Sequence, residues 1–439
     1  MKKVWQLCAA ALCVGALFTG GALAAETPED VLPAEGALPE AWGDLSEPGI
    51  ALFSLDDGVW DEDALCYGDV LTGEEKKAYE RLEAAYADYD ALELKTDEDG
   101  AVYAVASGLF STEYTDAYQT WFNEKGAVIQ TAATAYRCDH PESFFLGSLY
   151  GASMQVWYEN GTWMMCVDFK FALTAECRDA AAYESFQSEI DAVVDTLMNE
   201  TAGLSPVARL AYWDNWLAAN NEYNKDAADQ GTGYENKTPW NVISGLLPDY
   251  EPVCEGYSRS LQLLCHRAGI PCVVLNSNSH MWNAVQVGGV WYVVDSTWND
   301  PVWNNAGETL KYSTRNYFLV SAPTDSSHAV NMSFPTPPVS ESGFFKDWTL
   351  TDGGLTGSVS ASQSTTRWWV ALYDELGRMI ACAEGDWIDW PGSSFGKVCI
   401  APAFDSRDLA QAEYAVRFGV DTGGSWIPVD AALTIEKAA

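Results

Sequence analysis

Hydrophobic and polar residues follow two different periods along the chain, and these divide it into helical and strand-like stretches. Stretches beginning near Thr72, Ala180 and Ser205 carry apolar residues three and four positions apart, which is the spacing of one helical face. Thr72 and Glu75 have capping-box spacing, and Ser205 followed by Pro206 is a typical helix start. We therefore predict helices that begin at these three places.

Two runs between these helices have the composition of strands. "SMQVWYE" and "WMMCVDFKF" are rich in aromatic and β-branched residues, and the dipeptide Asn160-Gly161 separates them. Asn-Gly between two such runs is a strong signal for a tight β-hairpin. The region over residues 66–200 is therefore predicted to be α+β.

The stretch "PVCEGYSRS", residues 252–260, places a cysteine where a helix begins. Downstream apolar positions lie at i, i+4, i+7, i+8 and i+11, on one helical face: Tyr257, Leu261, Leu264, Cys265 and Ala268. Gly269 and Pro271 end this helix, and Thr238-Pro239 marks another helix start before it. Cys254 is thus predicted at a helix N-terminus, beside backbone N–H groups that lack helical acceptors.

Three strand-like runs follow that helix: "PCVVLNS", "HMWNAVQV" and "VWYVVDST". A tight turn at Gly288-Gly289 would set Trp282 opposite Asp295 in an antiparallel pair. His280 and Asp295 would then project from one face as diagonal neighbours, with backbones about 7–8 Å apart. The two side chains are therefore predicted to lie within reach of each other.

A thiol, an imidazole and a carboxylate in this arrangement point to nucleophilic catalysis. The helix N-terminus and a nearby imidazolium both stabilise the thiolate of Cys254. His280 can accept the thiol proton and later protonate a leaving amine, while Asp295 orients the ring. Trp282 and Trp298 would wall the site against water.

Each residue also has an interpretation without chemistry. Cys254 could be a disulfide or core cysteine, His280 a surface histidine, and Asp295 an aspartate at a strand end. A zinc site built from Cys254, Cys265, Cys272 and His280 would lack close ligand pairs, so we expect neither metal nor cofactor. "GSSFG", residues 392–396, matches a serine-nucleophile pattern but leads into a strand, so it is interpreted as a β-turn. The remaining histidines show no matching partners in the sequence: His140, His266 and His328.

The N-terminal "MKKVWQLCAAALCVGALFTGGALAAETPED" has two lysines, an apolar run and small residues up to Ala24. This is the layout of a cleaved secretory signal, and an uncleaved anchor is the alternative. No later segment is apolar for long enough to span a bilayer. We expect a secreted protein, either free or associated with the cell surface.

The formal charge is −39, and loss of Lys2 and Lys3 with the signal makes it −41. Such a charge argues against nucleic acid and anionic lipid as partners, because phosphate contacts need a basic face. A solvated acidic coat that keeps an exported protein soluble is the simplest interpretation. The sequence does not determine the oligomeric state.

Cysteine usage leaves the redox state open. Eleven cysteines become nine after signal removal, so at least one thiol stays free in an exported protein. Proximity in sequence favours the pairs Cys265–Cys272 and Cys382–Cys399. A nucleophilic Cys254 would have to remain unpaired.

From about Ser340 the pattern changes to short strands and turns, the rhythm of a β-sandwich. The Pro- and Ser-rich residues 321–343 are interpreted as a linker before it. The expected organisation is a signal peptide (1–24), an acidic linker (25–65), an α+β region (66–200), a catalytic core (201–330) and an immunoglobulin-like β-sandwich (340–439).

Three segments together resemble the transglutaminase-like superfamily: "VCEGYSRSLQLLCHRAGIPCVVLN", "HMWNAV" and "GGVWYVVDSTWNDP". They look most like its exported bacterial members, which carry a Cys-Glu-Gly-Tyr helix start and a His-x-Trp-Asn strand. The resemblance covers about residues 205–301, and "AYRCDHPESFF" resembles a segment that often precedes this core.

The resemblance implies a papain-like α+β fold, in which the helix bearing the cysteine packs on an antiparallel sheet. It also implies that the family's triad corresponds to Cys254, His280 and Asp295. Met281 departs from the family, where a small residue is usual. The remaining oxyanion donor is poorly fixed by motif, and Trp240 or Tyr234 could serve.

The function indicated is cysteine-dependent acyl transfer on amide bonds through a thioester. Water as acceptor gives a peptidase or amidase, the favoured outcome, because no calcium site typical of cross-linking enzymes is found in the sequence. An amine as acceptor gives a transglutaminase. The rival class is a catalytically weak surface binding protein that uses its β-sandwich. The expected partner is a peptide or protein substrate, which could be cell-wall or surface material.

Overall fold

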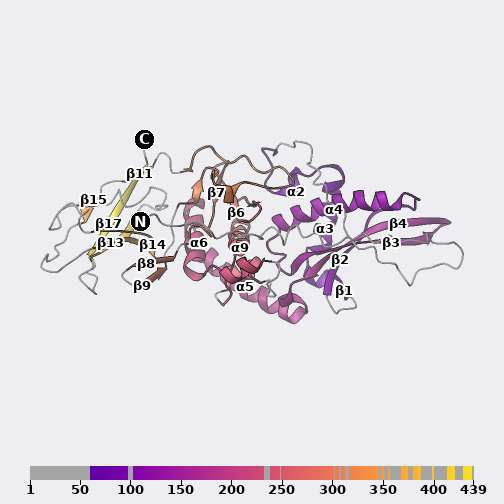
Figure 1. Ribbon diagram of the computed structural model, residues 1–439, viewed down its shortest axis with the longest axis horizontal. Helices are drawn as coiled ribbons and strands as arrows, with labels where there is room; N and C mark the ends of the chain where they lie inside the picture. Colours follow the sequence, from indigo (N-terminus) through magenta and orange to yellow (C-terminus); the bar gives the residue numbers. More distant parts are fainter. Residues whose placement is uncertain are drawn as a thin grey trace.

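The computed structural model describes most of residues 60–344 and the strands that follow (Figure 1). Undescribed positions up to residue 347 are 1–59, 97–101, 232–237, 248, 301, 306–307, 312–315 and 345–347. Beyond these, the described residues are those of the named strands. The expected signal peptide, most of the acidic linker and the predicted turn at 392–396 lie outside the described residues.

The first region combines helices with a four-stranded antiparallel sheet of order β1-β2-β4-β3. Its helices are α2 (Tyr67–Val70), α3 (Gly73–Tyr86), α4 (Tyr118–Asp139) and α5 (Ala180–Glu200), and its strands are β1 (Glu93–Thr96), β2 (Val102–Glu113), β3 (Leu146–Glu159) and β4 (Thr162–Leu173). The hairpin at Asn160-Gly161 is confirmed, since both residues have positive φ, 50° and 89°. The capping box is wrong, because Thr72 occupies the N-cap of α3 but its side chain makes no capping hydrogen bond.

The second region places helices against another antiparallel sheet, of order β10-β7-β6-β5. Its helices are α6 (Pro206–Asn220), α7 (Lys225–Gln230), α8 (Val242–Leu246) and α9 (Cys254–Arg267), and its strands are β5 (Cys272–Asn276), β6 (Met281–Val287), β7 (Val290–Val294) and β10 (Phe318–Val320). A separate hairpin joins β8 (Val302–Asn305) to β9 (Glu308–Lys311). The predicted α+β class is therefore confirmed for the described residues.

Helix starts in this region follow the sequence signals with one exception. Ser205 caps α6, its hydroxyl accepting from the N–H of Ala208 at 3.3 Å. Thr238-Pro239 instead opens a short 3₁₀ turn, η4 (Thr238–Trp240), and Asn241 caps α8 by accepting from the N–H of Ile243. The predicted helix start was thus placed three residues too early, because the asparagine makes the better cap.

The two regions share one continuous set of buried apolar side chains, which extends from Trp60 to Phe334. The Tyr67 hydroxyl in α2 donates to the carbonyl of Val274 in β5 at 2.5 Å, and Phe334 packs on the ring of Tyr67. Figure 1 shows α9 near the middle of the molecule, with the β2–β4 sheet to one side. The helix that begins at Cys254 is therefore anchored by both regions.

Residues 321–343, interpreted above as a linker, lie against the core instead. His328 and Phe334 are buried, and Val339 forms a bridge to Trp291 of β7. The N–H of Asn331 donates to the carbonyl of Asn276 at 2.7 Å. The proline-rich composition produces an extended segment that covers the sheet, and we call residues 321–343 the strap.

After the strap the described residues form strands. A five-stranded sheet has the order β11-β17-β16-β13-β14, and β12 pairs with β15. Their bounds are β11 (Trp348–Leu350), β12 (Gly354–Leu355), β13 (Arg367–Tyr373), β14 (Met379–Asp386), β15 (Val398–Cys399), β16 (Glu413–Val420) and β17 (Val429–Lys437). The predicted change to strands is confirmed, while the β-sandwich and the domain boundaries stay predictions.

We predict that residues 25–347 fold without the C-terminal strands, whereas residues 25–324 do not. The longer fragment keeps the strap and Phe344, whose ring meets Tyr292 at 5.7 Å. The shorter fragment exposes the apolar surface that Phe334 covers, and it lacks His328, so the buried Asp295 loses one of its partners. Thermal unfolding and near-UV circular dichroism of both fragments and the full chain check this. A longer fragment without cooperative unfolding would contradict it.

Candidate active site

Close backbone packing fixes the start of α9. A Cβ placed on Gly256 would lie 2.6 Å from the Ser244 hydroxyl and 2.7 Å from the Pro239 carbonyl oxygen. The N–H of Val253, the N-cap residue, donates to that same carbonyl at 3.0 Å. Only glycine permits this approach, so the Cys-Glu-Gly order holds Cys254 against η4 and α8 at the first turn of the helix.

Polar contacts then lock α9 onto the sheet. The Ser258 hydroxyl donates to the carbonyl of Met281 in β6 at 2.9 Å, and the Asn283 amide donates back to the carbonyl of Ser258 at 3.0 Å. The Tyr257 hydroxyl donates to the carboxylate of Asp300 at 2.6 Å. The helix therefore has one register against the strand that begins after His280.

The hairpin β6–β7 has the predicted register, with Val287 opposite Val290 and Asn283 opposite Val294. Gly288 and Gly289 both have positive φ, 60° and 80°, as the tight turn requires. His280 and Asp295 flank the paired residues at the same end of the hairpin. The hydroxyl of Ser277 accepts a hydrogen bond from the backbone N–H of His280 at 3.1 Å, which helps to fix the position of His280.

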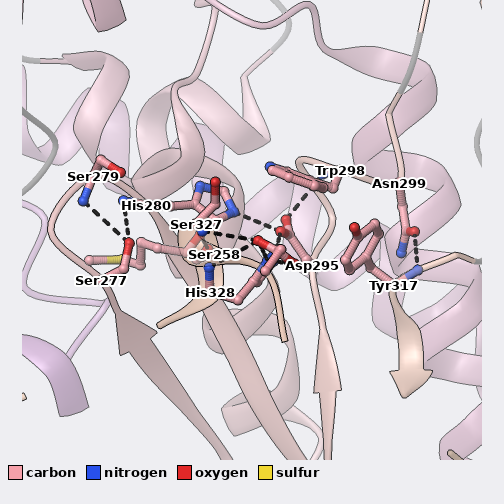
Figure 2. Close-up of polar contacts among 12 residues, drawn as sticks. Ser258, Ser277, Ser279, His280, Asp295, Trp298, Asn299, Tyr317, Ser327 and His328 are labelled. Atoms are coloured by element: carbon pink, nitrogen blue, oxygen red, sulfur yellow. Dashed lines mark hydrogen bonds and ion pairs between the residues drawn. The ribbon is translucent and has the colours of Figure 1, made fainter. Parts of the chain in front are cut away.

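His280 and Asp295 form a short buried contact, 2.6 Å between Nε2 and Oδ2 (Figure 2). Asp295 is completely buried and His280 is 6% exposed. The other carboxylate oxygen, Oδ1, accepts from the backbone N–H of Trp298 at 3.1 Å. Nε2 is thereby engaged, which leaves Nδ1 as the imidazole nitrogen that can face a thiol.

The electrostatics favour a charged pair. Burial lowers the pKa of the His280 imidazole, but the Asp295 carboxylate and a hydrogen bond with the Cys254 side chain raise it by more, to about 9. Burial alone would raise the pKa of Asp295, yet the two imidazoles beside it hold that pKa well below its usual range. At neutral pH His280 is therefore an imidazolium next to the Cys254 sulfur.

A second histidine, His328 of the strap, completes the surroundings of Asp295. Its Nε2 lies 2.9 Å from Asp295 Oδ2, and its Nδ1 lies 2.9 Å from Asp325 Oδ2 (Figure 2). Burial lowers the pKa of His328, but the two carboxylates raise it by more. The sequence interpretation that this histidine lacks partners is wrong. One signal was present, because Asp325 caps the turn η5 (Ser326–His328) that aims the ring.

Aromatic rings enclose the two imidazoles. Trp282 stacks on His280 with centroids 5.7 Å apart, and the ring of Trp298 lies 5.9 Å from it. Tyr317 stacks on His328 at 5.1 Å. Trp282 is buried, whereas Trp298 is 40% exposed. The two tryptophans thus lie where the sequence analysis expected walls, with Trp298 at the solvent side.

The candidate nucleophile is itself covered, since Cys254 has no exposed surface. A substrate must therefore displace a neighbouring side chain to reach the sulfur. Cys254 is not in a disulfide, and the same holds for the other cysteines whose side chains the structure describes: Cys66, Cys138, Cys166, Cys177, Cys265 and Cys272. Cys265 and Cys272 are hydrogen-bonded neighbours and not the disulfide that their spacing suggested.

The remaining predicted residues lie elsewhere. Tyr234 falls outside the described residues, and Trp240 packs with Ala227, Ala228 and Val253. His140 and His266 do have partners, contrary to expectation. The first contacts Glu142 at 2.7 Å, and the second contacts the carbonyl oxygen of Cys272 at 3.0 Å.

One group of side chains in the described part of the chain has the donors of a metal site. His280, Asp295 and His328 offer ligand atoms within 4.8 Å of one another. Both imidazoles place Nε2 at hydrogen-bond distance from the same oxygen, Asp295 Oδ2, at 2.6 Å for His280 and 2.9 Å for His328. The set is therefore described as a hydrogen-bonded imidazole–carboxylate cluster.

Comparison with known proteins gives a distant similarity. The chain is 24% identical over 163 residues to kyphoscoliosis peptidase of Mus musculus, and 23% identical over 159 residues to that of Homo sapiens. Each match covers 33% of this chain and 23% of the relative, so the chain spans less than a quarter of these relatives. No protein-family model matches the chain. The similarity is a coarse indication of transglutaminase-like, cysteine-type acyl-transfer or peptidase chemistry.

Among the described residues, no helix is both long enough and apolar enough to cross a membrane.

We predict that Cys254 reacts with iodoacetamide at pH 6–8 much faster than the other cysteines described here. The His280 imidazolium and the helix N-terminus favour its thiolate. Burial instead raises the pKa of Cys166 to about 11 and that of Cys138 to about 12. Mass spectrometry of timed samples measures each site, with Cys166 as the internal control. Equal rates at Cys254 and Cys166 would contradict the prediction.

We predict that His328→Leu slows alkylation of Cys254 about 10- to 100-fold, whereas His328→Gln stays closer to wild type. The leucine removes a charge-assisted hydrogen bond to Asp295, an interaction of roughly 1.5–3 kcal/mol, and each 1.36 kcal/mol is tenfold in rate. The glutamine amide can still donate to that carboxylate. Melting temperatures establish that both variants are folded. A folded leucine variant with the wild-type rate would show that His328 does not position the site.

Proposed function

We propose that this chain is an exported cysteine-dependent enzyme that hydrolyses amide bonds of a peptide or protein through a thioester. The observation that carries the proposal is the buried His280–Asp295 contact beside the Cys254 thiol at the first turn of α9. We further propose that α9 and the sheet β10-β7-β6-β5 form a papain-like core of the transglutaminase-like type. The distant similarity to a transglutaminase-like peptidase supports this.

The first half of the reaction forms the thioester. The Cys254 thiolate attacks the carbonyl carbon, and the carbonyl π electrons move to oxygen. Backbone N–H groups in the first turn of α9 stabilise that oxyanion, since the first helical N–H groups have no intrahelical acceptor. The His280 imidazolium gives its proton to the leaving nitrogen, the C–N bond breaks, and a neutral imidazole remains.

The second half releases the acyl group. Neutral His280 removes a proton from water, and the oxygen attacks the thioester carbon. The C–S bond breaks, the acid leaves, and the thiolate–imidazolium pair is restored. Asp295, held in turn by His328, keeps the His280 ring oriented through both steps.

The choice between hydrolysis and cross-linking depends on the acceptor, since both begin with the same thioester. Adding a primary amine such as putrescine during turnover distinguishes them. Release of free acid at a rate that the amine leaves unchanged supports hydrolysis, whereas near-complete capture as the amide supports a transglutaminase. No thioester and no turnover with any amide would favour a surface binding protein.

We predict that Asp295→Asn lowers turnover roughly 10²–10³-fold, with a melting curve recorded beside it to establish that the variant is folded. The asparagine amide favours the wrong imidazole tautomer, which costs about 10⁴-fold in a serine-protease template, and a thiol ionises more easily than a hydroxyl. An amide or thioester substrate found by screening serves for the assay. Near-normal turnover in this variant, with Cys254→Ala inactive, would leave a Cys–His dyad.

We predict that activity falls as the pH rises through about 9, because neutral His280 cannot protonate the leaving amine. The folded pKa lies above the usual value, so the stability that the contact with Asp295 contributes is fully present below about pH 6.5 and is lost as the pH rises to about 9. Asp295→Asn should move this alkaline limb to lower pH. A pH–rate profile of both proteins tests the shift, and identical limbs would exclude His280 as the titrating group.

A further inference from the structure

A small recess lies where the end of α4, the turn after it, η4 and α9 meet. It shares no lining residue with the His280–Asp295–His328 cluster. Its polar walls come from two arginines, an asparagine, a histidine and a serine: Arg137, Arg259, Asn241, His140 and Ser143. Arg259 follows Cys254 on α9 by five residues, so the same helix contributes to the recess and to the candidate active site.

The two guanidinium groups lie close together, with Arg259 buried and the Arg137 side chain 12% exposed. Arg259, whose side chain is 6% exposed, donates through Nε to Glu255 Oε1 at 2.7 Å and through Nη1 to the carbonyl of Arg137 at 2.5 Å. Arg137 Nη2 lies 3.7 Å from the same Glu255 oxygen. Arg259 Nη2 and Arg137 Nη1 remain buried without a hydrogen-bond partner.

The positive charge of the two arginines is only half balanced, because one carboxylate, Glu255, faces two guanidinium groups. Burial and the like charge of Arg259 lower the pKa of Arg137 to about 10, and Glu255 only partly opposes this. The nearby Asp139 carboxylate already accepts from the N–H groups of Tyr67 and Gly68. Among the ion pairs of the described residues, Glu255 is the carboxylate that contacts both arginines.

Asn241 adds a third unpartnered donor at the recess. Its Oδ1 caps α8 by accepting from the N–H of Ile243 at 2.9 Å, while its Nδ2 is buried without a partner. The asparagine is 7% exposed. These three unpartnered donors, two of them cationic, outnumber the one unpartnered oxygen of the neighbouring carboxylate, Glu255 Oε2, and are costly unless a further acceptor arrives from outside.

We propose that this recess binds a small oxyanion, a carboxylate or an inorganic anion such as phosphate, between Arg137, Arg259 and Asn241. A planar guanidinium presents paired N–H groups that match two oxygens of such a group, and the anion supplies the missing negative charge. The oxyanion has two sources. It is either a free anion or, if the proposed function holds, a carboxylate of the substrate that Cys254 attacks.

The test uses the full chain without its signal and measures melting temperature against phosphate at constant ionic strength. In wild type the melting temperature should rise by a few degrees and saturate, as for a ligand that binds only the folded state. Arg137→Lys keeps the charge but loses the guanidinium fork, so its half-saturating concentration should rise at least 10-fold.

Asn241→Asp is the sharpest variant, because aspartate caps a helix as well as asparagine does and places a carboxylate in the recess. It should melt higher than wild type without phosphate and lose the response to phosphate. Asn224→Asp is the matched control: Asn224 caps α7 in the same way, accepting from Ala227, but does not line the recess. It should respond to phosphate as wild type does.

Anions also stabilise proteins without binding to a site, and that effect grows steadily with concentration. Identical phosphate responses in wild type and Asn241→Asp would overturn the proposal. So would a wild-type melting temperature that phosphate does not change beyond the effect of chloride at the same ionic strength. Neither outcome depends on catalysis, so the proposed function can fail or stand separately.

Alkylation of Cys254 distinguishes the two sources. Iodoacetate carries a carboxylate and iodoacetamide does not. The ratio of the iodoacetate rate to the iodoacetamide rate therefore reports whether the recess binds the carboxylate of a reagent that alkylates Cys254. A ratio that falls at least 10-fold in Asn241→Asp but not in Asn224→Asp assigns the recess to the substrate carboxylate. An unchanged ratio, with the phosphate response lost, assigns it to a free anion.

Discussion

The buried carboxylate of Asp295 is the constraint on which the site depends. A carboxylate with no exposed surface is tolerated only when charged or polar donors surround it. Its donors come from three separate segments: His280 before β6, the N–H of Trp298 after β7, and His328 of the strap. The hairpin register, the turn beyond it and the course of the strap must therefore all be correct for this carboxylate to remain charged.

Helix α9 is constrained in a similar way, by hydrogen bonds of its buried polar side chains. Five polar residues on this one helix are almost completely buried: Glu255, Ser258, Arg259, Ser260 and Gln262. Ser258 contacts β6, whereas Gln262 and Arg259 donate to the carbonyls of Cys138 and Arg137 at the end of α4. A helix held by these hydrogen bonds cannot rotate or slide without breaking them. The position of Cys254 therefore depends on the first region as much as on the sheet.

The sequence could predict the elements whose signals are local. The hairpin at Gly288-Gly289 and the face of α9 follow from periodicity and turn chemistry, and together they bring His280 near Asp295. His328 was missed because it lies 33 residues beyond Asp295 in a segment without periodicity. Composition alone made that segment look like a linker, whereas its role depends on long-range packing, which no local pattern encodes.

Glu255 and Arg259 show a different limit of sequence-based prediction, because their pairing can be predicted but their burial cannot. Their i,i+4 spacing is visible in the sequence, but such pairs usually lie on an exposed helix face and contribute little. Here the pair is buried, and a second arginine from α4 joins it. The chain has only 24 lysines and arginines against 63 acidic residues, yet the buried Arg259 has a second, mostly buried arginine beside it. The Asp295 cluster pairs its charges internally, whereas the arginine cluster retains unpaired donors facing an open recess. That difference is why the first is interpreted as reaction machinery and the second as a place for a charge that the chain itself does not supply.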